Sequence, residues 1–320
     1  MQCVLLFLIL VSGCYALAQD CTQTLPINVL DQKMGTGVEA LQSSLFQARM
    51  GDLSIPIIGV QKVEHRRVLV LVDQSGSMAR RNSIGSHQKE ALDITEDTLN
   101  ELLQDLPIGV SVAYGFFNDK AVFTEGFFSD SRQLQQAIAD AKQRLKKPES
   151  GGTAMFDAIH QAILQFETPQ PGDALLLLSD GGENKSKLTE DKFEKEFRRS
   201  GLRLELLLVN QHSPEFAEPY VSMFIGLAHE TGGSVGIIDI NDMSWAIRKD
   251  AGANREALRK FWTQEVLGGY LMRVQPPRTL TKPRKWIVRI SADSNPELKH
   301  VTLQYPAKLA PCTLSWAAAH

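Results

Sequence analysis

The sequence predicts an α/β fold: a doubly wound, mostly parallel sheet with helices on both faces, joined to a small β-unit. Two continuous apolar runs, 68–72 and 174–178, are typical of strands that are buried in a parallel sheet. Strand and helix patterns alternate from residue 68 onward, which indicates a parallel sheet covered by helices. At both ends of the chain, short strand patterns separated by turns predict β structure instead.

The N-terminal flank, residues 19–64, has the pattern of a small β-unit. An apolar stretch at 27–30 precedes a turn-rich stretch at 31–37. Residues 45–52 end in a Gly-Asp turn, and a further strand pattern follows at 55–60. Short strands separated by turn signals favour β structure over helices.

The central segment, residues 65–265, contains the alternating elements. A tight turn at 118–120 separates two strand patterns, which predicts an antiparallel hairpin at a sheet edge. Apolar runs predict strands at 68–72, 109–117, 121–124, 174–178, 202–209 and 233–238. Apolar residues at helical spacing predict helices at 90–103, 131–145, 154–165, 189–199, 215–230 and 241–265.

The C-terminal flank, residues 266–320, returns to β patterns. Strands are expected at 268–274, 286–290 and 301–305, separated by Pro-rich or polar turns. Because the two flanks enclose the central segment in the chain, we expect them to pair in space as one β-unit.

The composition is that of a folded globular protein with room for more than one domain. The chain has 320 residues, of which 43% are hydrophobic and 22% are charged. A net charge of −3 argues against a nucleic-acid-binding protein. The pairs Lys146-Lys147 and Arg198-Arg199 are interpreted as solvated helix ends.

The first 18 residues predict a secretory signal peptide. They carry no charged residue, have an apolar core at 4–11, and end in Ala16-Leu17-Ala18. We therefore expect an exported protein, periplasmic or secreted. Residues 11–14, Val-Ser-Gly-Cys, resemble a lipobox, so a lipid-anchored envelope form through Cys14 is the alternative. No other run is long enough to span a bilayer.

Two cysteines remain after cleavage at residue 18, Cys21 and Cys312, near the two ends of the mature chain. An exported protein meets an oxidising compartment in which disulfides persist. We predict a disulfide between these residues, with two unpaired thiols as the alternative, since spacing does not fix pairing.

Oxygen-bearing side chains follow the buried strands at three places. Asp73, Ser75 and Ser77 come directly after the first strand, Thr153 lies in a Gly-rich loop, and Asp180 follows a second buried strand. Carboxyl ends of parallel strands share one sheet edge, where α/β proteins bind ligands. Two carboxylates and three hydroxyls suit a hard divalent cation with an open coordination position. The string at 73–77 alone favours a capped strand end, and the other two loops are needed to indicate a metal site.

The pattern Asp73-x-Ser75-x-Ser77, then Thr153, then Asp180 resembles the metal-ion-dependent adhesion site of von Willebrand factor type A (VWA) domains. The resemblance implies that the two serines bind the ion directly and that Asp73 stands outside the direct coordination. It implies that Thr153 and Asp180 act at the same ion, commonly through water. The implied ion is Mg²⁺, with Mn²⁺ or Ca²⁺ as alternatives.

The flanks resemble a bacterial VWFA-related family described from acidobacteria, whose members are exported proteins with β segments on both sides of the VWA core. The resembling stretches are 27–51, 152–159 and the pairs Gly269-Tyr270 and Lys285-Trp286. The stretch 250–252 and the end of the last tail strand at Pro306 depart from that pattern.

Other polar residues near the predicted site receive structural interpretations. Asp157 is interpreted as an acid in the first turn of a helix, where it favours the helix dipole. Glu183 and Asn184 are interpreted as loop caps. We expect no histidine or lysine close enough to the site to act as a general base.

The resemblance implies a protein-binding, adhesion-type module whose metal coordinates an Asp or Glu of a protein partner. The alternatives are an envelope component in which the metal only stabilises the fold, and a metal-assisted hydrolase. We expect no enzyme, because the sequence has no phosphate-binding loop, no dinucleotide-binding loop, no nucleophile elbow and no zinc-protease helix motif. A further hypothesis is that ligand binding moves the last helix, 241–265, which leads into the C-terminal flank.

Overall fold

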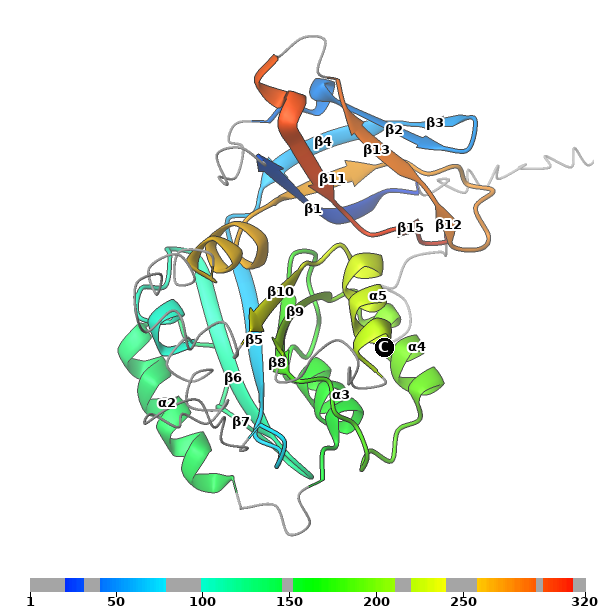
Figure 1. Cartoon of the computed structure of the whole chain (residues 1–320). Helices are drawn as coiled ribbons and strands as arrows, with labels where there is room; N and C mark the ends of the chain where they lie inside the picture. The colour runs from blue at the N-terminus through cyan, green and yellow to red at the C-terminus, as the bar shows by residue number, and fades with distance from the viewer. Residues whose placement is uncertain are drawn as a thin grey trace, which may run out of the picture.

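The computed structural model describes residues 21–31, 41–78, 99–145, 152–210, 220–239, 258–291 and 296–312. The predicted signal peptide, Cys14, most of the helix expected at 90–103 and the first part of that expected at 241–265 lie outside these ranges. Figure 1 shows an α/β domain with a β-unit stacked on one end of it. In the described ranges, no helix is both long and apolar enough to cross a membrane.

A six-stranded sheet forms the centre of the α/β domain, in the order β10-β9-β8-β5-β6-β7. Its strands are parallel except β7, which pairs antiparallel with β6 at the edge, as the predicted hairpin requires. The strands are β5 (Arg66–Asp73), β6 (Val110–Phe117), β7 (Ala121–Phe123), β8 (Ala174–Ser179), β9 (Arg203–Asn210) and β10 (Val235–Asp239).

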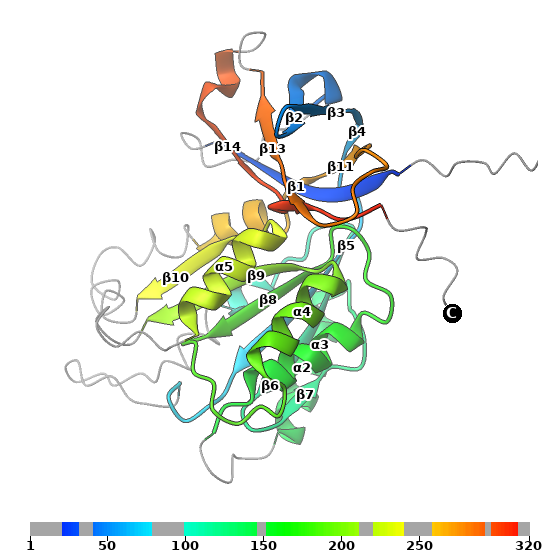
Figure 2. The same cartoon turned by 90° about the vertical axis from the view of Figure 1, so that its right-hand side faces the viewer.

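Helices cover both faces of this sheet, so the predicted fold class is confirmed (Figure 2). One face packs against α2 (Ser131–Arg144) and the π-helical turn Phe261–Val266. The other face packs against α3 (Met155–Gln165), α4 (Glu190–Ser200) and α5 (Val221–Thr231). The central strand β5 is buried on both faces, which explains its continuous apolar run.

The β-unit is built from both flanks, as the sequence predicts. β1 pairs antiparallel with β11 and β14, and β2 pairs with β13. Strands of the two flanks therefore alternate in the four-stranded sheet β14-β1-β11-β4 and meet in the three-stranded sheet β13-β2-β3. From the N-terminal flank come β1 (Gln23–Asp31), β2 (Phe46–Met50), β3 (Leu53–Ile55) and β4 (Ile57–Lys62). From the C-terminal flank come β11 (Tyr270–Val274), β12 (Arg284–Lys285), β13 (Ile287–Ile290), β14 (Val301–Gln304) and β15 (Lys308–Leu309).

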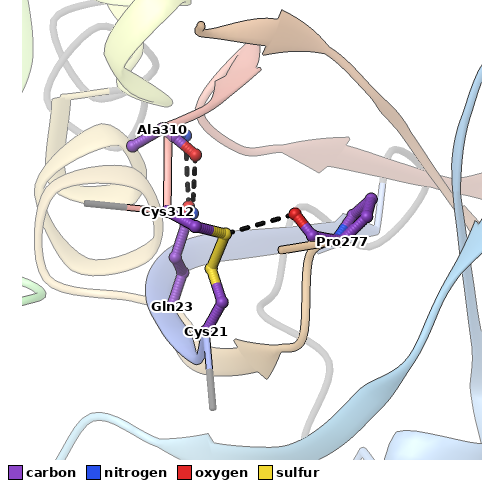
Figure 3. Close-up of a disulfide and its surroundings, with 5 residues drawn as sticks. All are labelled: Cys21, Gln23, Pro277, Ala310 and Cys312. Atoms are coloured by element: carbon purple, nitrogen blue, oxygen red, sulfur yellow. Dashed lines mark hydrogen bonds between the residues drawn. A yellow bond between two sulfur atoms is a disulfide. The ribbon is translucent and has the colours of Figure 1, made fainter. Parts of the chain in front are cut away.

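The predicted disulfide joins Cys21 to Cys312, with Cα atoms 5.6 Å apart (Figure 3). Beside it, the Gln23 amide donates to the Ala310 carbonyl at 2.7 Å and accepts from the Ala310 N–H at 3.1 Å. The first strand of the β-unit is therefore tied to the last described segment by one covalent bond and two hydrogen bonds.

Buried charges join the β-unit to the amino edge of the parallel sheet. Arg66 Nη1 and Arg203 Nη2 both donate to the Val266 carbonyl, at 2.9 and 2.6 Å. Arg203 Nη1 also donates to Asn28 Oδ1 at 2.9 Å, and the Asn28 amide donates to the Glu265 carbonyl at 2.9 Å. Strands β5 and β9, the end of the last helix and β1 thus meet at one buried junction.

Glu205 supplies the negative charge of this junction. Its Oε1 lies 2.7 Å from Arg203 Nε, so the two side chains form an ion pair, although the Arg203 N–H does not point at this oxygen. Its Oε2 accepts a hydrogen bond from Ser234 N at 2.7 Å. Burial raises the pKa of Glu205, and the charge of Arg203 acts against this rise.

Removing the disulfide should destabilise the protein. In the Cys21→Ser/Cys312→Ser variant, we expect a loss of about 2–5 kcal/mol in the free energy of unfolding, because the bridge closes a loop between residues 291 apart. Urea unfolding of the oxidised wild type and the double variant measures this loss. Equal stability of the two would contradict a formed Cys21–Cys312 bridge.

Breaking the buried ion pair should cost more than removing it whole. Arg203→Leu leaves Glu205 buried without its neighbouring cation, and we expect a loss of about 3–5 kcal/mol. The double variant with Glu205→Leu should recover part of this loss, because it also removes the carboxylate that Arg203→Leu deprives of the Arg203 charge. Urea unfolding measures both, and a double variant less stable than Arg203→Leu would contradict the account.

Candidate metal centre

Asp73 ends the central strand and is completely buried. Its Oδ1 accepts from Ser75 N at 2.8 Å, which shapes the turn after the strand. Its Oδ2 accepts from the Ser179 hydroxyl at 2.6 Å, which ties this turn to the end of β8. The Gln74 N–H donates to the Phe117 carbonyl at 2.7 Å, so the turn is also fixed to the end of β6.

Ser75 and Ser77 place their hydroxyls side by side. The two Oγ atoms lie 3.0 Å apart, with Ser75 buried and Ser77 half-buried. The alternate spacing of the serines therefore delivers two neutral oxygens to one place, as the sequence predicts.

Thr153 is buried and is held against the loop that follows β8. Its N–H donates to Asn184 Oδ1 at 3.0 Å, and its carbonyl accepts from the backbone N–H groups of Asn184 and Lys185, each at 3.0 Å. These bonds connect the second and third loops of the site, which lie 31 residues apart in the chain. Asn184 is thus the loop-stabilising residue that the sequence indicated.

The start of α3 is capped by a residue from the third loop. Glu183 Oε2 accepts from the N–H groups of Met155 and Phe156 at 2.6 and 3.1 Å, which satisfies donors at the first turn of the helix. Both carboxylate oxygens of Asp157 accept backbone N–H groups, from Lys187 and Leu188, at 2.9 Å. Glu183 is therefore a cap, as expected. Asp157 lies in the first turn of α3, as expected, and it also holds the loop before α4, which the sequence did not indicate.

Gly182 marks the point on which the three loops converge. A Cβ placed there would lie 3.4 Å from Asp180 Oδ1 and 4.0 Å from each of Ser77 Oγ and Thr153 Oγ1. One oxygen from each loop thus surrounds the same small space, which the missing side chain leaves open. With Ser75 beside Ser77 and Asp73 behind them, the five predicted residues lie together.

The charges at this edge favour a cation. Burial, followed by the charge of Asp180, raises the pKa of Asp73 to about 7, although hydrogen bonds from Ser179 and Ser75 act against the rise. A positive charge beside the two carboxylates would compensate both effects. Two carboxylates and three hydroxyls are hard oxygen donors, so the residues present fit Mg²⁺, Mn²⁺ or Ca²⁺.

Hydroxyl groups are essential to this donor set. Within the described ranges, no three His, Cys, Asp or Glu side chains cluster in a way that could hold a metal ion. An ion bound at this edge would have the hydroxyls of Ser75, Ser77 and Thr153 as neighbouring neutral ligands beside the two carboxylates. That these five residues bind an ion stays a prediction.

A lysine lies closer to the site than the sequence indicated. The aliphatic stem of Lys185 covers Gly152, because a Cβ at Gly152 would lie only 2.2 Å from Lys185 Cγ. Gly152 directly precedes Thr153, so an exposed, flexible side chain carries a positive charge at the rim of the site. The shape of the loop after β8 brings this lysine there, and no sequence spacing signals it.

The family model described as von Willebrand factor type A domain matches residues 68–183. This range contains all five predicted site residues, and the chain thus contains a VWA domain. A comparison with curated proteins gives no match. The finer resemblance to the acidobacterial VWFA-related family stays a prediction.

Solved structures with a similar fold include three of different origin. BatB from Bacteroides thetaiotaomicron is 17% identical, with 60% of this chain and 98% of that chain covered and a TM-score of 0.41. A von Willebrand factor type A protein from Catenulispora acidiphila is 13% identical, with coverages of 92% and 74% and a TM-score of 0.46.

The third is proximal thread matrix protein 1 from the mussel byssus, solved with a zinc-occupied metal-ion-dependent adhesion site (MIDAS) motif. It is 16% identical, with 67% of this chain and 49% of that chain covered and a TM-score of 0.47, so the match spans about half of its length. At these identities and TM-scores, the three similarities support no conclusion about the function of this chain.

Filling the space at Gly182 should weaken metal binding without unfolding the protein. In Gly182→Ala, the new methyl group would stand among three of the predicted oxygens at ordinary contact distances. We expect the affinity for Mg²⁺ or Mn²⁺ to fall about tenfold, as for other changes beside metal ligands. Isothermal titration calorimetry measures the affinity.

Gly226→Ala is the matched control, because a Cβ at this helical glycine meets nothing within 4 Å. The control should bind the metal as the wild type does. Unchanged affinity in Gly182→Ala would contradict the placement of the ion beside Gly182.

Proposed function

We propose that this VWA-domain protein is an exported, divalent-cation-dependent binding module that holds the acidic side chain of a protein partner. The observation that carries the proposal is the convergence of Ser77, Thr153 and Asp180 oxygens around the space beside Gly182. The site lies at the carboxyl edge of the sheet, and the β-unit attaches at the opposite edge, so a partner can approach it (Figure 1).

The residues of the site take different roles in this proposal. Ser75, Ser77, Thr153 and Asp180 would hold the ion, directly or through water. Asp73 keeps its two hydrogen bonds, to Ser75 N and to the Ser179 hydroxyl, and so fixes the positions of the other ligands. When bound, the ion supplies a positive charge and an open coordination position that accepts a carboxylate oxygen.

Binding is favoured over catalysis by the chemistry of the site. The proposed ligands are acids and hydroxyls, and none of the histidines that the structure describes belongs to the loops of the site: His65, His160, His229 and His300. His160, the one in a helix that starts at the site, pairs with Glu196 at 2.9 Å. A general base beside the ion, which a metal-assisted hydrolase needs, has no candidate among them.

One sequence string matches the spacing of an enzyme motif, but its place in the structure does not fit that motif. Residues 232–236 read Gly-Gly-Ser-Val-Gly, so the expectation that the sequence has no Gly-x-Ser-x-Gly spacing, the pattern of a nucleophile elbow, was wrong. A nucleophile elbow exposes its serine between a strand and the following helix. Here Ser234 is buried, precedes strand β10, and its hydroxyl donates to Gln304 at 2.8 Å.

Lys185 adds a second element of recognition. Its flexible ammonium group lies at the rim of the site and its backbone N–H is fixed to Thr153 and Glu183. A partner segment with a second acid near the coordinating one would gain an attractive charge pair there. Acidic partners should therefore bind faster and more tightly than partners with a single carboxylate.

Export is supported by two features. Residues 1–18 have the pattern of a signal peptide, and the Cys21–Cys312 disulfide suits an oxidising compartment. The proposed locations are the periplasm or the exterior, with a lipid-anchored envelope form through Cys14 as the alternative.

An ion that only stabilises the fold is the second candidate function. It is favoured by the complete burial of the Asp73 carboxylate, because an ion that offsets its charge would stabilise the folded state. Thermal unfolding with Mg²⁺ and with EDTA detects this effect, and the partner assay separates it from binding.

The partner assay compares Asp180→Asn with Asp191→Asn, a matched loss of one charge at an exposed position in the first turn of α4. Tagged protein is incubated with cell-envelope extract in Mg²⁺ or EDTA, and proteins captured only in Mg²⁺ are quantified by mass spectrometry. We expect the Mg²⁺-dependent capture by Asp180→Asn to fall more than about tenfold below that of the wild type. Asp191→Asn should keep it.

Two results would contradict the proposal. Capture that is equal in Mg²⁺ and EDTA would exclude a metal-dependent module. A metal that raises the melting temperature while Asp180→Asn captures partners normally would favour the stabilising ion instead.

A further inference from the structure

One segment of the chain has a strong local positive charge that the net charge of −3 conceals. Residues 266–292 contain no Asp or Glu and six cationic residues: Arg273, Arg278, Lys282, Arg284, Lys285 and Arg289. The other 28 of the 34 Lys and Arg residues, and all 37 Asp and Glu residues, lie elsewhere. The segment forms β11, β12 and β13 of the β-unit, so the charge is concentrated in one part of the fold.

Part of this charge lies on one face of the three-stranded sheet β13-β2-β3. Trp286 and Val288 are buried. Ile287 and Arg289 of β13, and Lys285 at the end of the preceding strand β12, alternate with them and are exposed. In the neighbouring strand, the exposed Arg49 lies directly opposite Ile287. Directly opposed residues share a face, so three cations surround one isoleucine. We call Arg49, Lys285, Ile287 and Arg289 the cationic sheet face.

Little negative charge opposes this face. Among the described residues, no acid forms an ion pair with Lys285 or Arg289. Asp52 is the one acid in the three strands and the turn between β2 and β3, and its carbonyl, not its carboxylate, accepts from Arg49 at 3.4 Å. Lys308 in β15 differs, because it pairs with Glu230 at 3.2 Å.

The face also exposes apolar surface at its centre. Ile287 is 52% exposed. A purely polar polyanion bound to this face would not bury the Ile287 side chain. At a membrane surface, the same side chain enters the boundary between headgroups and acyl chains. Each Lys or Arg there is attracted by the anionic headgroups.

We propose that the cationic sheet face docks on an anionic lipid bilayer, with Arg49, Lys285 and Arg289 at the phosphates and Ile287 at the acyl boundary. The β-unit lies beyond the amino ends of the parallel strands, and the candidate metal centre lies at their carboxyl ends (Figures 1 and 2). A membrane bound through the β-unit would therefore leave the metal centre facing away from the bilayer, accessible to a partner.

Sedimentation with vesicles tests the proposal. The full chain is mixed, in EDTA and at low salt, with phosphatidylcholine vesicles that contain or lack phosphatidylglycerol. We expect binding that needs phosphatidylglycerol and weakens as salt increases. An apolar N-terminal segment would bind both kinds of vesicle, so the difference between them reports the charged surface. EDTA removes the contribution of the metal centre.

Two pairs of substitutions localise the binding. Lys285→Glu/Arg289→Glu reverses two charges of the face, and Lys192→Glu/Lys195→Glu reverses two exposed charges on α4, with the same change in net charge. We expect at least tenfold weaker vesicle binding for the first pair and little change for the second. Ile287→Ser should weaken binding with no change in charge. Melting temperatures confirm that each variant is folded.

Three outcomes would overturn the proposal. The wild type could bind phosphatidylglycerol vesicles no better than phosphatidylcholine vesicles. The two charge-reversed pairs could lose binding equally, which would indicate a response to net charge alone. The face could bind soluble polyglutamate but not vesicles, which would identify an acidic protein segment as its occupant.

Discussion

The site depends on one buried carboxylate, that of Asp73. It ends the central strand, where solvent cannot reach it, and its two oxygens hold the first loop to itself and to the end of β8. Burying a carboxylate is unfavourable unless it is hydrogen-bonded and its charge is compensated. The hydrogen bonds are present, and in the proposed site a bound ion would supply the compensating charge.

The same residue would link metal binding to pH. Its pKa is raised from 3.8 to about 7, chiefly by burial and then by Asp180. A carboxyl with a raised folded-state pKa binds its proton more tightly in the folded protein than in the unfolded chain. The metal-free protein therefore loses stability as the pH rises from about 3.8 to about 7. A bound cation would oppose this loss, because it stabilises the charged carboxylate.

The opposite end of the sheet also contains buried charge, but there the chain supplies both signs. Arg66 and Arg203 share the Val266 carbonyl, and Glu205 lies beside Arg203. This junction holds the end of the last helix to the α/β domain and the β-unit. The hypothesis that ligand binding moves that helix would require these bonds to break or shift. The helix itself ends in the π-helical turn Phe261–Val266, a form often found at functional sites.

Periodicity and loop position were sufficient to predict the fold class, the hairpin at the sheet edge, the pairing of the flanks and the meeting of Asp73, Ser75, Ser77, Thr153 and Asp180. Each of these follows from local patterns together with the shared edge of a parallel sheet. The two-residue strands β12 and β15 have no periodicity to detect. The stem of Lys185 over Gly152 and the position of Arg49 opposite Ile287 depend on tertiary approach and on strand register, which the sequence pattern does not specify.

The most direct measurement of the central claim is the anomalous diffraction of Mn²⁺ in crystals of the protein. The account predicts one strong peak in the space beside Gly182, in contact with the hydroxyls of Ser75 and Ser77, and no peak there in crystals of Asp180→Asn. A wild-type crystal grown in saturating Mn²⁺ without density at this position would contradict the account. So would an ion bound only at another part of the surface.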